Sequence, residues 1–163
     1  LAAGDALAVA LMKVRGFGRD HFAQNHPGGR LGKRLTLKVS DIMRGGEDNP
    51  VVRSTVSAQA MLMEMTRMRA GAVSVIDARG RLVGLITDFD IRRGLQKGLD
   101  IRKLSVQRLM NPRPTTIAPT ALAARAVEVM ENRKNPFNVL PVVDSRGRSV
   151  GMIQIHDLRA RGL

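Results

Sequence analysis

The sequence contains no cysteine, no tryptophan and no tyrosine, and phenylalanine occurs only four times in 163 residues. The lack of cysteine excludes disulfides and thiolate metal sites. No apolar run approaches the roughly 18 residues that a membrane-spanning helix needs, and the first residues lack the charged-then-apolar order of a signal peptide. We therefore expect a cytoplasmic protein with no membrane partner, whose core is filled by aliphatic side chains and nine methionines.

Acidic residues are few. The sequence has 14 Asp and Glu but 27 Lys and Arg, which gives a formal net charge of +13. Such a charge is compatible with nucleic acid, with an anionic ligand or with an acidic partner segment. The basic residues are scattered along the chain, without interleaved aromatics and without a helix-turn-helix signature. This layout disfavours nucleic acid as a partner and favours a basic, solvated surface.

The clearest pattern present is an internal repeat at an offset of 67 residues. The stretch G-L-I-T-D-F-D at Gly84–Asp90 returns as G-M-I-Q-I-H-D at Gly151–Asp157, and Met43 matches Met110. We call Gly84–Asp90 the first strand exit and Gly151–Asp157 the second strand exit. Read from the residues alone, the glycine allows a close turn and the aspartate caps a helix.

Each copy predicts the element order β-α-β-β-α. The first copy has a short strand at Val51-Val52, a helix capped by Thr55, strands over 72–76 and 81–87, and a helix from Asp88. The second has a strand over 115–117, a helix capped by Thr120, strands over 138–143 and 148–154, and a helix from Ile155. Buried helix faces follow the 3.6-residue period at Met61, Met65 and Met68, and at Ala123, Val127 and Met130.

Tight hairpin turns are predicted at Asp77–Gly80 and Asp144–Gly147, where Asp opens and Gly closes four residues. One copy of roughly 60 residues cannot cover the faces of its sheet, so two copies must pack together. We predict an α/β (α+β) fold of two such units.

A different kind of segment precedes the repeat. Asp5–Arg15 is apolar on nearly every side of a helix, and Gly16 is placed to end that helix. Such a helix is normally buried in a larger body. We therefore expect residues 1–38 to be the tail of another domain that lies upstream.

The two units resemble cystathionine-β-synthase (CBS) domains in tandem, the regulatory pair called a Bateman module. The resemblance covers Val39–Leu163 and rests on S-D-I-M at Ser40–Met43, R-L-M at Arg108–Met110 and both strand exits. Upstream, G-D-A-L-A-V-A-L at Gly4–Leu11 and H-P-G-G-x-L-G-x-x-L at His26–Leu35 resemble the end of the sugar-isomerase (SIS) domain in arabinose-5-phosphate isomerases of the KpsF/GutQ type. The expected ranges are 1–38 for the SIS remnant, 39–97 for the first CBS domain and 98–163 for the second.

The resemblance implies the regulatory part of an isomerase that interconverts D-ribulose 5-phosphate and D-arabinose 5-phosphate, for Kdo in lipopolysaccharide or capsule. His26 matches the histidine to which the family assigns an active-site role. The other catalytic groups of a SIS domain have no counterpart here, so we expect the chain alone to be inactive. The implied protein partners are the upstream SIS domain and further copies of the chain, as a CBS-mediated dimer within a tetrameric full-length enzyme.

The resemblance also implies nucleotide contacts at the strand exits. In CBS pairs a Ser or Thr hydroxyl lies near a phosphate, and an Asp three residues on accepts hydrogen bonds from ribose. Thr87 and Asp90 match both roles; the second copy keeps Asp157, but has Gln154 in place of the threonine and His156 before the aspartate. The implied nucleotide-binding residues are thus Thr87, Asp90, Asp157 and His156, with the first exit the better site. The implied effector is an adenine nucleotide or CMP-Kdo, and no cofactor or metal is required.

Two alternatives remain open from the sequence. One is a stand-alone adenine-nucleotide sensor without an enzymatic partner domain, against which the apolar helix at Asp5–Arg15 argues. The other is a nucleic-acid-binding CBS protein, whose binding would weaken steeply with added salt.

Overall fold

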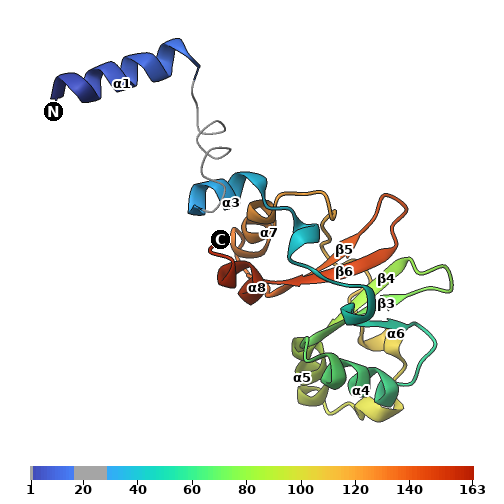
Figure 1. The fold of residues 1–163 in the computed structure, drawn as a ribbon. Coiled ribbons are helices and arrows are strands. Elements are labelled where there is room, and N and C mark those ends of the chain that lie inside the picture. The colour runs from blue at the N-terminus through green and yellow to red at the C-terminus, as the bar shows by residue number, and fades with distance from the viewer. Residues whose placement is uncertain (1, 17–28) are drawn as a thin grey trace.

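The computed structural model describes residues 2–16 and 29–163. Figure 1 shows two small sheets lying close together, each accompanied by its own helices. The predicted α/β architecture of two repeated units is confirmed. His26, the predicted active-site histidine, lies outside the described residues.

The first unit has the predicted order of elements. Its elements are β2 (Val51–Arg53), α4 (Ala58–Met68), β3 (Ala72–Ile76), β4 (Leu82–Thr87) and α5 (Asp88–Gln96). The sheet order is β2-β3-β4, with β2 parallel and β4 antiparallel to β3. The predicted cap Thr55 is wrong: it lies in the turn before the helix, and Ser57 caps α4 by accepting a hydrogen bond from the Ala60 N–H.

The second unit comprises α7 (Ala123–Glu131), β5 (Val139–Val143), β6 (Ser149–Gln154) and α8 (Ile155–Ala160). The strand predicted over 115–117 is reduced to a single parallel bridge between Ile117 and Val142. Prolines at 114 and 119 flank this segment and cannot donate to a ladder, which keeps it short. The predicted cap Thr120 is also wrong, because Leu122 holds the N-cap position of α7 without a side-chain bond.

Within residues 29–163, short elements precede each of these two units, four before β2 and two between α5 and α7. They are α3 (Arg30–Thr36), η1 (Val39–Asp41), β1 (Arg44–Gly45), η2 (Gly46–Asp48), η3 (Ile101–Lys103) and α6 (Val106–Leu109). Among the described residues, no helix is both long enough and apolar enough to cross a bilayer.

The segment before each copy packs on the other copy. β1 pairs antiparallel with β6, so that Arg44 faces Met152 and Gly45 faces Gly151, and the sheet order is β1-β6-β5. Reciprocally, Asn111 exchanges two backbone hydrogen bonds with Leu85 in β4, of 2.8 and 3.0 Å. Each packed unit therefore contains one copy of the repeat together with the leading segment of the other copy.

The cores reflect this exchange. Met61, Met65 and Val75 of the first unit pack with Val106 and Leu109 from the segment that leads into the second copy. The second core contains Val39 together with the buried side chains of α7, β5 and β6. A small third cluster joins the sheets: Ala70, Ala72, Leu85 and Met152. The predicted buried faces are confirmed at Met61, Met65, Ala123 and Met130, whereas Met68 and Val127 are only half-buried.

The two predicted hairpin turns are confirmed, and they are joined to each other. Gly80 and Gly147 have positive φ angles of 77° and 74°, which favour glycine. The Leu82 N–H donates to the Gly147 carbonyl at 3.0 Å, and the Ser149 N–H donates to the Gly80 carbonyl at 3.1 Å. The hairpins thus form a second contact between the units, in addition to the exchanged leading segments.

The predicted N-terminal helix is present as α1 (Ala2–Val14), and Gly16, with φ 60°, follows its end. Four of its large apolar side chains are exposed: Leu7, Leu11, Met12 and Val14.

Candidate functional site

Thr87 and Asp90 form a capping box at the start of α5. Thr87 is the N-cap residue, and its hydroxyl donates to Asp90 Oδ2 at 2.7 Å. The same carboxylate oxygen accepts from the Thr87 N–H at 3.0 Å, while the Thr87 hydroxyl accepts from the Asp90 N–H at 3.4 Å. Both predicted residues are therefore brought together, and both already serve the helix end.

The second oxygen of Asp90 is less engaged. Asp90 Oδ1 lies 3.4 Å from the Nη2 atom of Arg93, whose side chain is 55% exposed, against 11% for Asp90. An ionised carboxylate accepts about four hydrogen bonds through its two oxygens, so Oδ1 retains acceptor capacity for a ligand hydroxyl. The geometry of the first strand exit is that of a preorganised acceptor beside a helix N-terminus.

The beginning of β3 lies against this helix end. The Asp88 N–H donates to the Gly71 carbonyl at 3.0 Å, and a Cβ at Gly71 would lie 3.1 Å from Asp88 Oδ2. Gly71 also has a φ of 61°, so a side chain there would be strained as well as crowded. The close approach of these two segments positions the first turn of α5.

The second strand exit is built differently. Gln154 holds the N-cap position of α8 without a side-chain cap, and its amide Nε2 donates to the Ala70 carbonyl of the first unit. Asp157 Oδ1 lies 3.2 Å from His156 Nε2, and Asp157 Oδ2 lies 3.6 Å from Arg44 Nε. The predicted pair His156 and Asp157 is therefore adjacent, but Asp157 also faces an arginine that the sequence reading did not single out.

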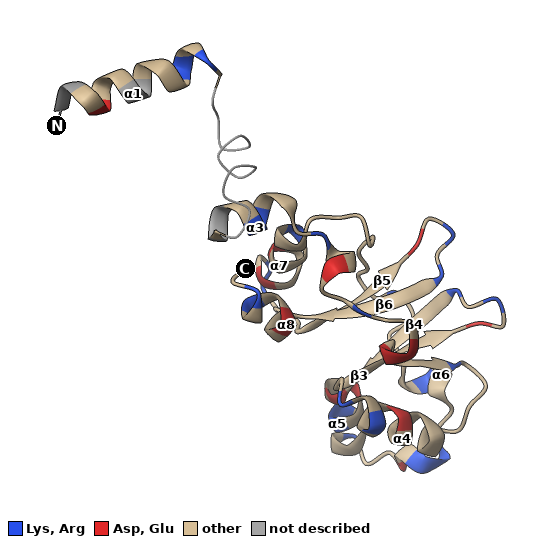
Figure 2. Cartoon of the chain, in the orientation of Figure 1, with Lys and Arg blue, Asp and Glu red and all other residues tan. Residues whose placement is uncertain are grey.

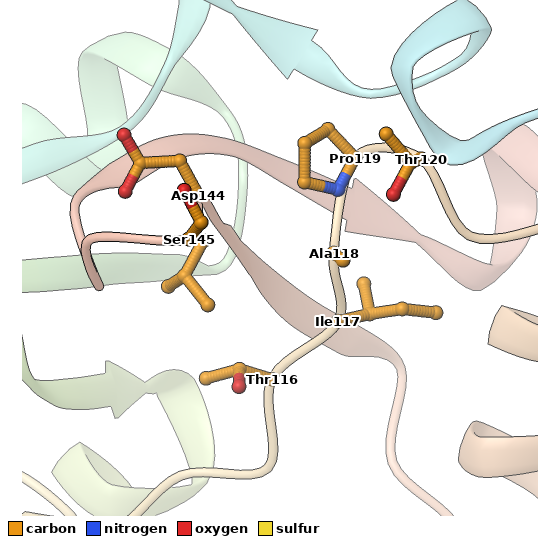
Figure 3. A pocket seen from close by; sticks show the side chains of 8 residues that line it. Thr116, Ile117, Ala118, Pro119, Thr120, Asp144 and Ser145 are labelled. Atoms are coloured by element: carbon orange, nitrogen blue, oxygen red, sulfur yellow. The ribbon is translucent and has the colours of Figure 1, made fainter.

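A separate hollow lies in the second unit (Figure 3). It has a volume of about 520 Å³ and is lined by residues 116–120 and by Val143, Asp144 and Ser145. Asp144 accepts from the backbone N–H groups of Arg146 and Arg148, both at 2.9 Å, and from Arg148 Nε at 2.7 Å. The backbone N–H of Arg148 is the main reason that the pKa of this carboxyl is lowered. None of the predicted site residues lines the hollow, and its carboxylate is already satisfied, so the strand exits remain the better candidate site.

Sequence comparison agrees with this architecture. The family profile described as CBS domain matches residues 39–97 and 106–162. The chain belongs to the CBS domain family. Its predicted nature as a tandem CBS pair is thereby confirmed.

The whole CBS chain is similar to arabinose 5-phosphate isomerases. It is 44% identical over 163 residues to KdsD of Pseudomonas aeruginosa and 39% identical over 164 residues to KdsD of Escherichia coli strain K12. It covers 49% of each, so the chain spans about half the length of these curated relatives.

Solved CBS structures show the same fold. CBSX2 in complex with AMP is 25% identical with a TM-score of 0.64, and the match covers 77% of this chain and 96% of that one. CBSX2 from Arabidopsis thaliana has a TM-score of 0.65 at 25% identity, over 77% of this chain and 94% of that one.

The positive charge of the CBS pair is spread over both units (Figure 2). Several arginines pair with acidic neighbours, including Arg81 with Asp77, Arg148 with Asp144 and Arg159 with Glu131. In the part of the chain that the structure describes, no group of three or more His, Asp or Glu side chains could hold a metal ion.

Proposed function

We propose that this chain is the regulatory CBS pair of a D-arabinose 5-phosphate isomerase. The similarity to two KdsD proteins extends over the whole chain yet covers only 49% of each relative, which leaves room for a catalytic SIS domain elsewhere. The complete enzyme interconverts D-ribulose 5-phosphate and D-arabinose 5-phosphate. In this proposal residues 1–38 end the SIS domain, 39–97 and 98–163 are the CBS repeats, and His26 acts only together with the SIS domain.

The regulatory ligand is a nucleotide that binds at the first strand exit. The observation that carries this proposal is the pairing of Thr87 with Asp90 at the N-terminus of α5. The phosphate lies at the N-terminus of α5, because a helix N-terminus favours anions, and the Thr87 hydroxyl turns its proton from Asp90 Oδ2 to the phosphate when the nucleotide binds. Asp90 Oδ1 accepts the hydrogen bonds of the ribose hydroxyls. CBSX2, solved with AMP and 25% identical to this chain, supports an adenine nucleotide as the first probe.

The alternative effector is CMP-Kdo, the activated end product of the proposed pathway. The test is a thermal-shift and calorimetric panel of AMP, ADP, ATP, CMP and CMP-Kdo. A ligand that binds the folded state raises its melting temperature, and a ligand at 100 times its Kd adds about 2.7 kcal/mol. No shift with any member of the panel would contradict the proposed nucleotide site.

The variant Asp90→Ala examines the site itself. Loss of charge-assisted hydrogen bonds worth about 1.5–3 kcal/mol should weaken nucleotide binding roughly ten- to a hundred-fold. Asp100→Ala is the matched control, since Asp100 caps η3 by accepting from the Arg102 N–H and lies in neither strand exit. If Asp90→Ala lowers the melting temperature but leaves affinity unchanged, Asp90 serves only the capping box.

A further inference from the structure

The two strand exits come from one repeat, yet among the described residues only the second is joined to the opposite unit by side-chain hydrogen bonds and an ion pair. Arg44 Nη1 donates to the Met68 carbonyl at 3.2 Å, and Arg44 Nε lies 3.6 Å from Asp157 Oδ2. Gln154, which is 3% exposed, donates its amide to the carbonyl of Ala70. Met68 is the last residue of α4 and Ala70 lies two residues beyond it, and carbonyls at a helix C-terminus lack intrahelical partners and favour cations.

The backbone, and not only the side chain, holds Arg44 in this place. Arg44 pairs with Met152 in the β1–β6 ladder, directly beside the second strand exit. A Cβ at Gly151 would lie 2.9 Å from the Arg44 carbonyl oxygen, so the close approach of β1 depends on that glycine. The guanidinium is thereby fixed between Asp157 of one unit and Met68 of the other.

At the first strand exit the matched residues are different. The repeat places Asn111 where the other copy has Arg44, and Thr87 where the other copy has Gln154. Asn111 Oδ1 accepts from the Arg113 N–H at 3.1 Å, within its own turn. The hydrogen bonds and ion pair of the Asp90 carboxylate in the described structure all lie within residues 87–93. The first exit therefore lacks the cross-unit tie that closes the second.

We propose that Arg44 is an internal ligand of the second strand exit, so that each chain binds nucleotide at the first exit only. A ribose hydroxyl that reaches Asp157 Oδ2 must displace the guanidinium, which removes the ion pair of Asp157 and the donor of the Met68 carbonyl together. Both side chains are half-buried, but the Asp157 Oδ2 atom is itself buried and makes no hydrogen bond in the described structure, so removing the guanidinium leaves this charged oxygen without a partner. This inference rests on the proposed nucleotide site at the first exit, and it assigns the second exit to holding the two units together.

Calorimetric titration with AMP tests the stoichiometry. The wild-type chain should bind one AMP, and Asp90→Ala should weaken that binding roughly ten- to a hundred-fold. The double variant Arg44→Asn/Gln154→Thr gives the second exit the residues of the first at these two positions and should bind a second AMP, which Asp157→Ala in the same background should remove. Arg79→Asn, which removes an exposed arginine of the hairpin turn, should leave one AMP per chain.

Two AMP per wild-type chain would overturn the proposal. A folded double variant that still binds one AMP would overturn it as well. If the double variant does not fold, Arg44→Gln carries the same expectation, because it retains the aliphatic stem and removes the guanidinium.

A second experiment needs no nucleotide and tests this inference independently of the proposed function. Arg44→Asn and Asp157→Asn should each lower the melting temperature, and combining them should lower it no further than the larger single change. Additive losses would show that the two residues do not interact and would overturn the proposal. If wild type binds no AMP, the proposed nucleotide site fails, and this thermal cycle alone decides whether Arg44 closes the second exit.

Discussion

Met110 lies against the α-carbon of Gly84, so closely that a Cβ at this glycine would come within 2.8 Å of the Met110 Cγ. Met43 has the same relationship to Gly151, where a Cβ would come within 2.7 Å of its Sδ. The recurring glycine of the two strand exits is therefore required by the exchange of leading segments. Each copy leaves room on its last strand for the methionine that the other copy supplies.

We expect Gly84→Ala and Gly151→Ala both to destabilise the fold, by about 1–3 kcal/mol, because the added methyl group overpacks a filled contact. Gly151→Ala should cost more, since its Cβ also meets the backbone oxygen of Arg44, whereas Gly84 meets only a flexible methionine. Urea unfolding measures both. Gly4→Ala is the control, because a Cβ there has no atom within 4 Å. Equal, negligible losses at both exits would contradict this account of the repeat.

The carboxylates of the two hairpin turns should make the free energy of unfolding depend on pH. The pKa of Asp144 is lowered, chiefly by the backbone N–H of Arg148, and that of Asp77 is lowered in the same way by Arg81. Because the folded-state pKa lies below the unfolded value of about 3.9, the stabilisation is complete above that value and is lost as the pH falls through the lowered one. Asp144→Asn should therefore lower the melting temperature at neutral pH and have little effect well below pH 3. If Asp144→Asn lowers the melting temperature equally at all pH values, the stabilising role of the ionised carboxylate is contradicted.

We expect the chain to form a homodimer or a larger species at tens of micromolar. Two apolar side chains of α1, Leu7 and Val14, are 64% and 84% exposed, which favours their burial against a partner. Sedimentation measures the state, and a chain of residues 29–163 is the control. Retention of the dimer without α1 would assign the contact to the CBS pair, and a monomeric full chain would contradict the prediction.

We expect no isomerase activity from these 163 residues alone. The only predicted active-site residue in the sequence is His26, and a proton transfer between two carbons needs an acid and a base positioned on one substrate. An assay of arabinose 5-phosphate conversion tests this, with the full-length enzyme as the positive control. Measurable turnover by the chain would refute the assignment of catalysis to the SIS domain.

Much of each unit could be predicted because its signals are local. The hairpins follow from an Asp and a Gly at the two ends of a four-residue turn, and the helix at Asp88 follows from a Thr that accepts from an N–H three residues on. The N-cap residues could not be predicted in the same way. Thr55 and Ser57 both precede the first helix, Thr120 and Leu122 both precede the second, and the folded backbone decides which of them takes the N-cap position. The strand predicted over 115–117 was too long, because the neighbouring prolines limit its pairing to a single bridge.

The sequence by itself determined that there are two copies, where their strands turn, and which helix faces are apolar, because spacing along the chain encodes these features. Only the tertiary structure decided which copy each leading segment packs against. It also placed Arg44 between Met68 and Asp157, residues of opposite units, and Gln154 on the Ala70 carbonyl 84 residues away. No local pattern predicts such pairs, since they depend on how two folded sheets meet. The physical difference between the exits that becomes meaningful only after packing lies chiefly in two exchanges, Thr87 for Gln154 and Asn111 for Arg44.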